Sequence, residues 1–104
     1  MKILLWCDDL MSRTRLRSPW EAAGAVMLKR SEEDKRPDLI VLDLGANGAM
    51  DHLRRLRGKF SDVPILVFGP HVDGEGLLAA KAAGASEIVS RGAVVERVLH
   101  KLQR

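Results

Sequence analysis

The acidic residues of this chain that could do chemistry stand directly after short apolar runs. Asp8 and Asp9 follow the run Ile3–Cys7. Asp43 follows the run Leu39–Leu42. Adjacent carboxylates repel one another unless a cation or a basic side chain lies beside them. Carboxylates grouped in this way can hold a divalent cation or offer an anionic oxygen to a phosphate. An equally simple interpretation is that these aspartates only cap the turns and helices that follow them.

The elements that must position these acids form an alternating series. The apolar runs are short, contain β-branched residues and lack polar alternation, which is typical of strands buried on both faces of a parallel sheet. We expect strands over Ile3–Cys7, Ala25–Leu28, Leu39–Leu42, Val63–Phe68 and Glu87–Val89. We expect helices over Leu10–Gly24 (interrupted at Pro19), Ala49–Phe60, Gly76–Ala83 and Val94–Leu102. The pattern predicts one α/β domain over residues 1–104, a three-layer sandwich with helices on both faces of the sheet.

Composition excludes several other classes of protein. The chain is 46% hydrophobic and 30% charged, as expected of an ordinary globular domain. No apolar run approaches the roughly 20 residues that cross a bilayer, and the N-terminal run is too short for a signal peptide. A single cysteine, Cys7, excludes an internal disulfide and suits a reducing compartment. We therefore expect a cytoplasmic protein that does not bind membranes.

Four segments, in this order along almost the whole chain, carry a family resemblance. They are Asp8-Asp9, Pro37–Asp43, Val63–Val67 and Ala82–Ser86. Together they resemble the receiver (CheY-like) domain of bacterial two-component response regulators. The resemblance implies a flavodoxin-like (βα)5 fold with strand order 2-1-3-4-5, in which Asp43 accepts a phosphoryl group from a histidine kinase. It also implies a Mg²⁺ site formed by Asp8, Asp9, Asp43 and the carbonyl of Gly45, so we expect the three carboxylates to converge in one shallow pocket.

The positions that sense the phosphoryl group in receivers are changed in this chain. Where receivers end the fourth strand with Thr or Ser, Gly69 offers no hydroxyl. Where they end the fifth strand with Lys-Pro, this chain has Arg91 and Gly92, and arginine is larger and forked. Ile88 stands about where the switch aromatic residue would be. The second helix is shortened, because Ser31–Arg36 can hold one helical turn at most.

An intact acidic half beside an altered sensing half indicates a degenerate receiver, or pseudo-receiver. We expect a stand-alone protein-interaction module in signalling, without catalytic activity of its own. Its partner would be a histidine kinase, another signalling protein or a second copy of the chain. The resemblance places the contact on the fourth helix, the fifth strand and the fifth helix.

Two other functions stay open. One is a working receiver that is phosphorylated on Asp43 with Mg²⁺ and uses Arg91 in place of lysine. The other is a small phosphate- or nucleotide-binding enzyme on the same fold, with His71 and Asp73 of the loop after the fourth strand as catalytic groups. A loop histidine without a function is the simpler interpretation of His71.

The arginine-rich helix surfaces do not indicate nucleic-acid binding. Arg54, Arg55 and Arg57 are expected on the outer face of one helix, and Arg13, Arg15 and Arg17 on another. No aromatic stacking residues are interleaved with them, and the formal charge of the chain is only +3. We expect solvated faces crossed by ion pairs.

Overall fold

A computed structural model of the chain describes residues 1–69 and 74–103. Its strands are β1 (Lys2–Trp6), β2 (Val26–Leu28), β3 (Leu39–Asp43), β4 (Ile65–Gly69) and β5 (Glu87–Ser90). Its α-helices are α1 (Leu10–Ala22), α2 (Ala49–Lys59), α3 (Gly74–Ala82) and α4 (Val94–Leu102), and the 3₁₀ helix η1 (Arg30–Lys35) follows β2. Among the described helices, none combines the length and apolar character needed to cross a membrane.

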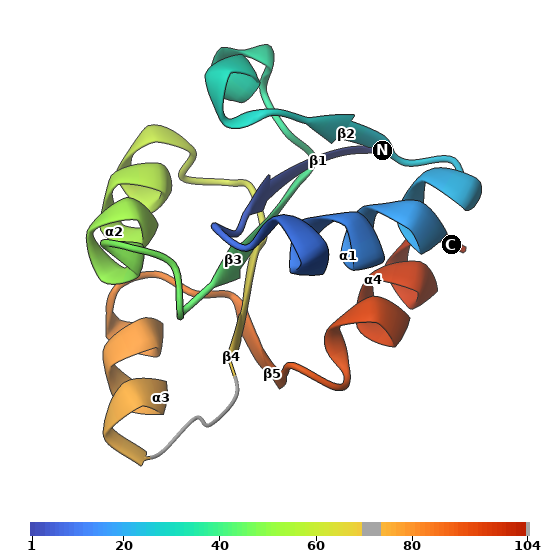
Figure 1. The fold of residues 1–104 in the computed structure, drawn as a ribbon. Helices are drawn as coiled ribbons and strands as arrows, with labels where there is room; N and C mark the ends of the chain where they lie inside the picture. The colour runs from blue at the N-terminus through green and yellow to red at the C-terminus, as the bar shows by residue number, and fades with distance from the viewer. Residues whose placement is uncertain (70–73, 104) are drawn as a thin grey trace.

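The strands form one parallel sheet in the order β2-β1-β3-β4-β5. Helices α1 and α4 cover one face of this sheet, and α2 and α3 cover the other (Figure 1). The expected fold, layers and strand order are therefore confirmed. Trp6 of β1 pairs in register with Leu42 of β3, so the two strands end side by side at the same edge.

Each central strand is apolar at successive positions because it is buried on both faces. In β1, Leu4 and Trp6 belong to the core cluster that includes Leu53 of α2. The alternate residues Ile3 and Leu5 belong to the second cluster, beneath α1 and α4. This arrangement is the physical origin of the short unbroken apolar runs in the sequence.

Helix α1 runs through Pro19 without the interruption that the sequence predicted, so that prediction is wrong. Leu16 and Trp20, on either side of the proline, are both buried in the core. The indole N–H of Trp20 donates to the carbonyl of Val95 in α4 at 3.2 Å. Packing of this helical face outweighs the hydrogen bond that proline removes. The helix ends at Ala22, and Gly24 then turns the chain with φ 99°.

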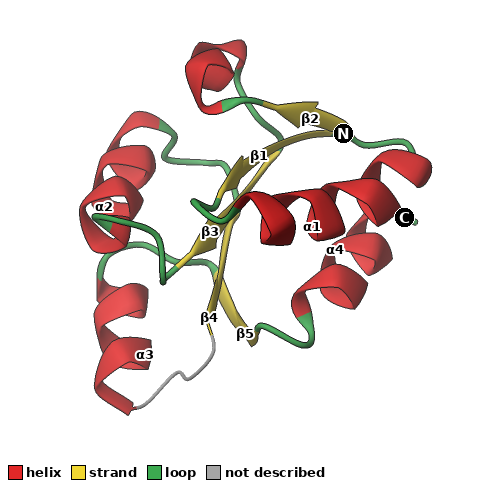
Figure 2. Cartoon of the chain, viewed as in Figure 1, coloured by secondary structure: helices red, strands yellow, loops and turns green. Residues whose placement is uncertain are grey.

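The second helix of the series is reduced to η1, as the sequence predicted, and η1 buries none of its residues. It lies beyond β2 at the edge of the sheet (Figure 2). Its attachment to the domain is electrostatic. Glu33 accepts from Arg55 at 2.7 Å and from Lys59 at 2.8 Å, and both of these cations belong to α2.

Arg57 was expected on the solvated face of α2, and the structure corrects this. Its Nε donates to the carbonyl of Gly84 at 2.9 Å, and its Nη1 donates to that of Val63 at 2.8 Å. Its Nη2 donates to the hydroxyl of Ser86 at 2.9 Å. The side chain therefore joins the end of α2 to the segments that lead into β4 and β5. Gly84 has φ 113°, and a Cβ there would lie 2.5 Å from Cγ of Arg57, so this close approach requires glycine.

Candidate functional site

Asp43, the last residue of β3, lies at the carboxyl edge of the sheet with its side chain only 7% exposed. Its Oδ1 accepts from the backbone N–H of Gly45 at 2.8 Å and from Nη2 of Arg91 at 3.1 Å. The thiol of Cys7 lies 3.5 Å from its Oδ2. Burial, together with the charge of Asp43, raises the pKa of the Cys7 thiol. Cys7 therefore stays protonated and donates to the carboxylate.

Arg91 follows β5 and brings a positive charge to Asp43, as expected of the residue at the receiver lysine position. Its backbone N–H donates to the carbonyl of Gly69 at 3.1 Å, which fixes the start of the β5–α4 connection beside β4. The guanidinium carbon also lies 5.3 Å from the ring centroid of Phe68. The fork is therefore held from two sides while it contacts Asp43.

Gly69 is the last residue of β4, the position at which the sequence predicted that a receiver's Thr or Ser hydroxyl is missing. A Cβ built on it would meet Cβ of Leu44 at 3.5 Å, which is ordinary van der Waals contact. The backbone therefore does not demand glycine here. Crowding at Cβ therefore does not explain why this chain has glycine and no hydroxyl at this position.

Asp8 is held by partners from two other parts of the chain. Its Oδ1 accepts from Nη2 of Arg30 at 2.6 Å, and its Oδ2 accepts from the backbone N–H of Asn47 at 2.7 Å. The Asn47 N–H and then the Arg30 guanidinium lower the pKa of Asp8. Through Asn47, the carboxylate contacts the loop between β3 and α2 that also carries Gly45. Asp8 and Asp43 therefore flank one loop.

Asp9 turns away from this loop and caps α1. Its Oδ2 accepts from the backbone N–H of Ser12 at 3.1 Å and from the Ser12 hydroxyl at 2.6 Å. These hydrogen bonds, the hydroxyl one foremost, lower the pKa of Asp9. The capping interpretation left open by the sequence therefore describes this residue.

The arrangement of these side chains does not fit a Mg²⁺ ion. Among the residues that the structure describes, no three His, Cys, Asp or Glu side chains are grouped so that they could hold a metal. Each carboxylate instead has donors from the protein, with Arg30 on Asp8 and Arg91 on Asp43. Of the three carboxylates expected to converge, Asp8 and Asp43 each accept from a backbone N–H of the loop after β3, whereas Asp9 caps α1. Gly45, expected to offer its carbonyl to a metal, donates its N–H to Asp43. His71 and Asp73 lie outside the described residues.

The sequence did not predict the group of side chains that surrounds Trp6. Arg30 and Arg55 place their guanidinium carbons 4.6 Å and 5.4 Å from the indole centroid, and the ring of His52 lies 4.3 Å away. Trp6 therefore joins η1 to α2 and orients Arg30 toward Asp8. A tryptophan within a crowded first strand, beside the shortened second helix, was the one signal of this group in the sequence.

Comparison with known proteins places the fold. No protein-family model matches the chain, and no curated protein sequence matches it. The chemotaxis protein CheY4 of Vibrio cholerae superposes with a TM-score of 0.86 at 21% identity, covering 99% of this chain and 96% of that one. A receiver domain protein (CheY-like) from Methanospirillum hungatei JF-1 gives 0.83 at 15% identity, covering 98% and 93%. The chain has the fold of a CheY-like receiver domain.

A further receiver neighbour is a LuxR-family response regulator from Aurantimonas sp. SI85-9A1, with a TM-score of 0.78 at 24% identity and coverage of 98% and 84%. In chain order, η1 lies between β2 and β3, where a receiver has its second helix. The fourth helix, fifth strand and fifth helix of a receiver are then α3, β5 and α4 of this chain. We call this surface the α3–β5–α4 face.

Proposed function

We propose that this chain is a degenerate receiver that acts by binding another protein, and that Mg²⁺-dependent phosphorylation of Asp43 does not control it. The observation that carries the proposal is that two arginines of the chain itself bind the carboxylates of Asp43 and Asp8. Arg91 contacts Asp43 at 3.1 Å and Arg30 contacts Asp8 at 2.6 Å. A Mg²⁺ ion would have to compete with these two guanidinium groups for the carboxylate oxygens, and most directly with Arg30 for Asp8.

The position that would report a phosphoryl group supports the same proposal. Gly69 has no hydroxyl to contact a phosphate, although a Cβ at this position would make only ordinary van der Waals contact. A phosphoryl group on Asp43 would therefore meet no hydroxyl at the end of β4. Without such a contact, a phosphate at Asp43 loses the interaction with a β4 hydroxyl that would favour one conformation over another.

The α3–β5–α4 face supplies a surface for a protein partner. Leu78 of α3 is 70% exposed, which is high for a large apolar side chain. On α4, Arg97 and Lys101 both pair with Glu87 of β5, so these charges are ordered across the face. We infer that these three elements carry both an exposed apolar side chain and ordered charges with which another protein, or a second copy of the chain, could pair.

Intact mass spectrometry after incubation with Mg²⁺ and acetyl phosphate tests this proposal. We expect no stable gain of one phosphate by the wild-type chain. Asp43→Asn serves as the matched control, because it keeps the shape of the side chain and cannot form an acyl phosphate. A phosphate adduct on the wild type that disappears in Asp43→Asn would contradict the proposal.

That outcome would favour the alternative function, a working receiver phosphorylated on Asp43. One observation supports this alternative. Arg91 keeps a positive charge at Asp43 and could neutralise a phosphate oxygen as the lysine of a receiver does. Arg91→Lys would then raise the yield of the adduct. If the degenerate receiver is correct, neither the wild type nor Arg91→Lys gains mass.

A further inference from the structure

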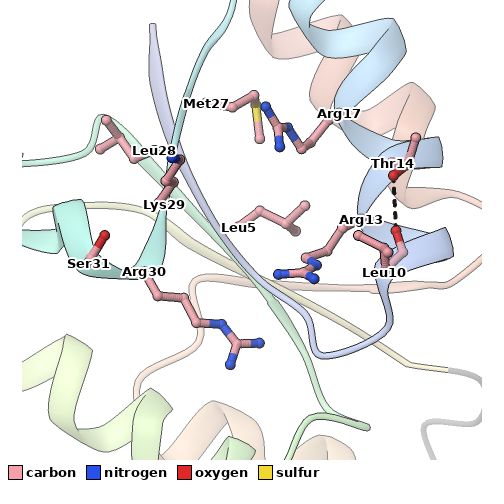
Figure 3. A pocket seen from close by; sticks show the side chains of 10 residues that line it. All are labelled: Leu5, Leu10, Arg13, Thr14, Arg17, Met27, Leu28, Lys29, Arg30 and Ser31. Atoms are coloured by element: carbon pink, nitrogen blue, oxygen red, sulfur yellow. Dashed lines mark hydrogen bonds between the residues drawn. The ribbon is translucent and has the colours of Figure 1, made fainter.

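A pocket of about 400 Å³ lies between the first half of α1 and the strand β2 with the turn after it (Figure 3). Its floor is apolar and is formed by Leu5, Leu10, Met27 and Leu28. This volume lies within the range of pockets that bind small molecules. The loop of Asp43 does not line it. We call it the basic pocket, for the reason given next.

Four cationic side chains and no acidic one line the basic pocket. Arg13 and Arg17 come from α1, and Lys29 and Arg30 come from the end of β2 and the start of η1. Figure 3 shows Arg13 and Arg17 reaching from α1 toward the strands. The sequence predicted that both arginines would lie on a solvated helix face. Of the cations after β2, Arg30 directs its guanidinium away from them, to Asp8 and the ring of Trp6.

Two of these cations already have an acidic partner outside the pocket, and two do not. Arg17 pairs with Glu21 at 3.5 Å, and Arg30 pairs with Asp8 at 2.6 Å. Within the described part of the chain, no ion pair or hydrogen bond engages the side chain of Arg13. Its Nε is buried and has no hydrogen-bond partner. Lys29 likewise has no ion-pair partner among the described residues.

This arrangement is unfavourable for the domain by itself. Arg13 and Arg17 are four residues apart on one helix, where like charges repel. A buried donor without an acceptor loses its hydration and gains nothing in return. An anion in the pocket would supply the acceptor for Arg13 and relieve the repulsion. The apolar floor would at the same time be covered by the uncharged part of the same molecule.

We propose that the basic pocket binds a small organic phosphate, that is, a phosphate group on an apolar body. Two guanidinium forks and an ammonium group match the charge and the oxygen geometry of a phosphate dianion better than those of a carboxylate. The concave shape and the apolar floor favour a small molecule over an acidic peptide. The proposal does not depend on the state of Asp43 or on the α3–β5–α4 face.

Isothermal titration calorimetry with 1-naphthyl phosphate tests this site. We expect wild-type protein to bind 1-naphthyl phosphate at least ten-fold more tightly than either 1-naphthol or inorganic phosphate, because each lacks half of the ligand. 1-Naphthoate should bind at least three-fold more weakly, and hexaglutamate should not compete. Equal affinity for 1-naphthoate would overturn the assignment to phosphate. Binding of inorganic phosphate as tight as that of the ester, or competition by hexaglutamate, would overturn the small-molecule pocket.

Arg13→Met separates a binding role of Arg13 from a structural one. We expect at least a five-fold loss of affinity for 1-naphthyl phosphate, while the melting temperature without ligand stays equal or rises by a few degrees, because an unpartnered buried donor is removed. Arg54→Gln, on the exposed side of α2, is the matched charge control and should change affinity less than two-fold. Equal losses in both variants, or a lower melting temperature of Arg13→Met, would overturn the proposal.

Discussion

Asp43 and Arg91 form the contact on which the candidate site depends. The carboxylate is almost fully buried, and the guanidinium is 35% exposed, so solvent weakens their attraction only in part. The N–H of Gly45 and the thiol of Cys7 complete the set of donors to Asp43. Removing the arginine would therefore leave a buried negative charge with two neutral donors.

We expect Arg91→Ala to lower the free energy of unfolding by about 1–2 kcal/mol, since the buried carboxylate loses its cation. Urea unfolding of the wild type, Arg91→Ala, Asp43→Asn and the double variant gives the coupling between the two residues. We expect a favourable coupling free energy between Arg91 and Asp43. Strictly additive effects of the two single variants would show that the pair contributes nothing to stability.

Arg30 occupies one oxygen of the Asp8 carboxylate, and the N–H of Asn47 occupies the other. We expect Arg30→Gln to bind Mg²⁺ at least ten-fold more tightly than the wild type, because a tethered cation no longer competes for the carboxylate. Calorimetric titration with MgCl₂ measures this, and Arg36→Gln, whose arginine pairs with the distant Asp62, is the control. Wild-type protein that binds Mg²⁺ as tightly as Arg30→Gln would refute this role of Arg30.

At the scale of the elements, η1 is held to the domain by charge, because it buries no residue of its own. Glu33 is the centre of this attachment, and the Arg55 guanidinium, followed by Lys59, lowers the pKa of Glu33. A depressed pKa in the folded state gives stability that is complete above the ordinary glutamate pKa of about 4.3 and is lost as the pH falls through the folded value.

We therefore expect the melting temperature to fall as the pH is lowered from about 5 toward 3, and to fall less in Glu33→Gln. The glutamine variant keeps a hydrogen-bond acceptor but does not titrate. Differential scanning calorimetry over this pH range measures both proteins. Parallel pH curves for the two would show that Glu33 does not contribute to the acid sensitivity.

The hydrogen bonds of the Arg57 side chain also connect whole elements, since they join α2 to the segments before β4 and β5. We expect Arg57→Ala to lower the free energy of unfolding by about 2–3 kcal/mol, because several backbone carbonyls lose a charged donor together. Arg54→Ala, three residues earlier and exposed, should change it by less than about 0.5 kcal/mol. Chemical denaturation of both variants tests the difference. Similar small effects would mean that the hydrogen bonds of Arg57 contribute little to stability.

At the scale of the whole molecule, the alternation of apolar runs and helices predicted the parallel sheet and its three layers, and the resemblance to receivers predicted the strand order. Buried strands need apolar side chains on both faces, so the runs mark the sheet directly. The placement of Asp8 and Asp43 at one edge follows from the same rule. The partners of the long side chains could not be predicted in this way. Arg30 reaches Asp8 and Arg57 reaches Gly84 across 22 and 27 residues of sequence, and only the tertiary packing decides where such flexible groups end.

The molecule as a whole keeps the receiver architecture while its acidic edge is neutralised from within. Arg30 follows β2 and Arg91 follows β5, so they come from opposite edges of the sheet. Arg30 contacts Asp8, just after β1, and Arg91 contacts Asp43, the last residue of β3. In the function proposed above, the α3–β5–α4 face binds a partner without a covalent switch at Asp43. The basic pocket beside α1 is lined by residues 5–31 and therefore lies apart from that face.

Two-dimensional ¹H–¹⁵N NMR of the wild-type chain, recorded before and after addition of Mg²⁺ with beryllofluoride, tests the central claim most directly. If the arginines hold Asp8 and Asp43 closed and Gly69 cannot report a phosphate, the amide resonances of α3, β5 and α4 should not move. Saturable, concerted shifts on that face, lost in Asp43→Asn, would show that the chain is a working receiver.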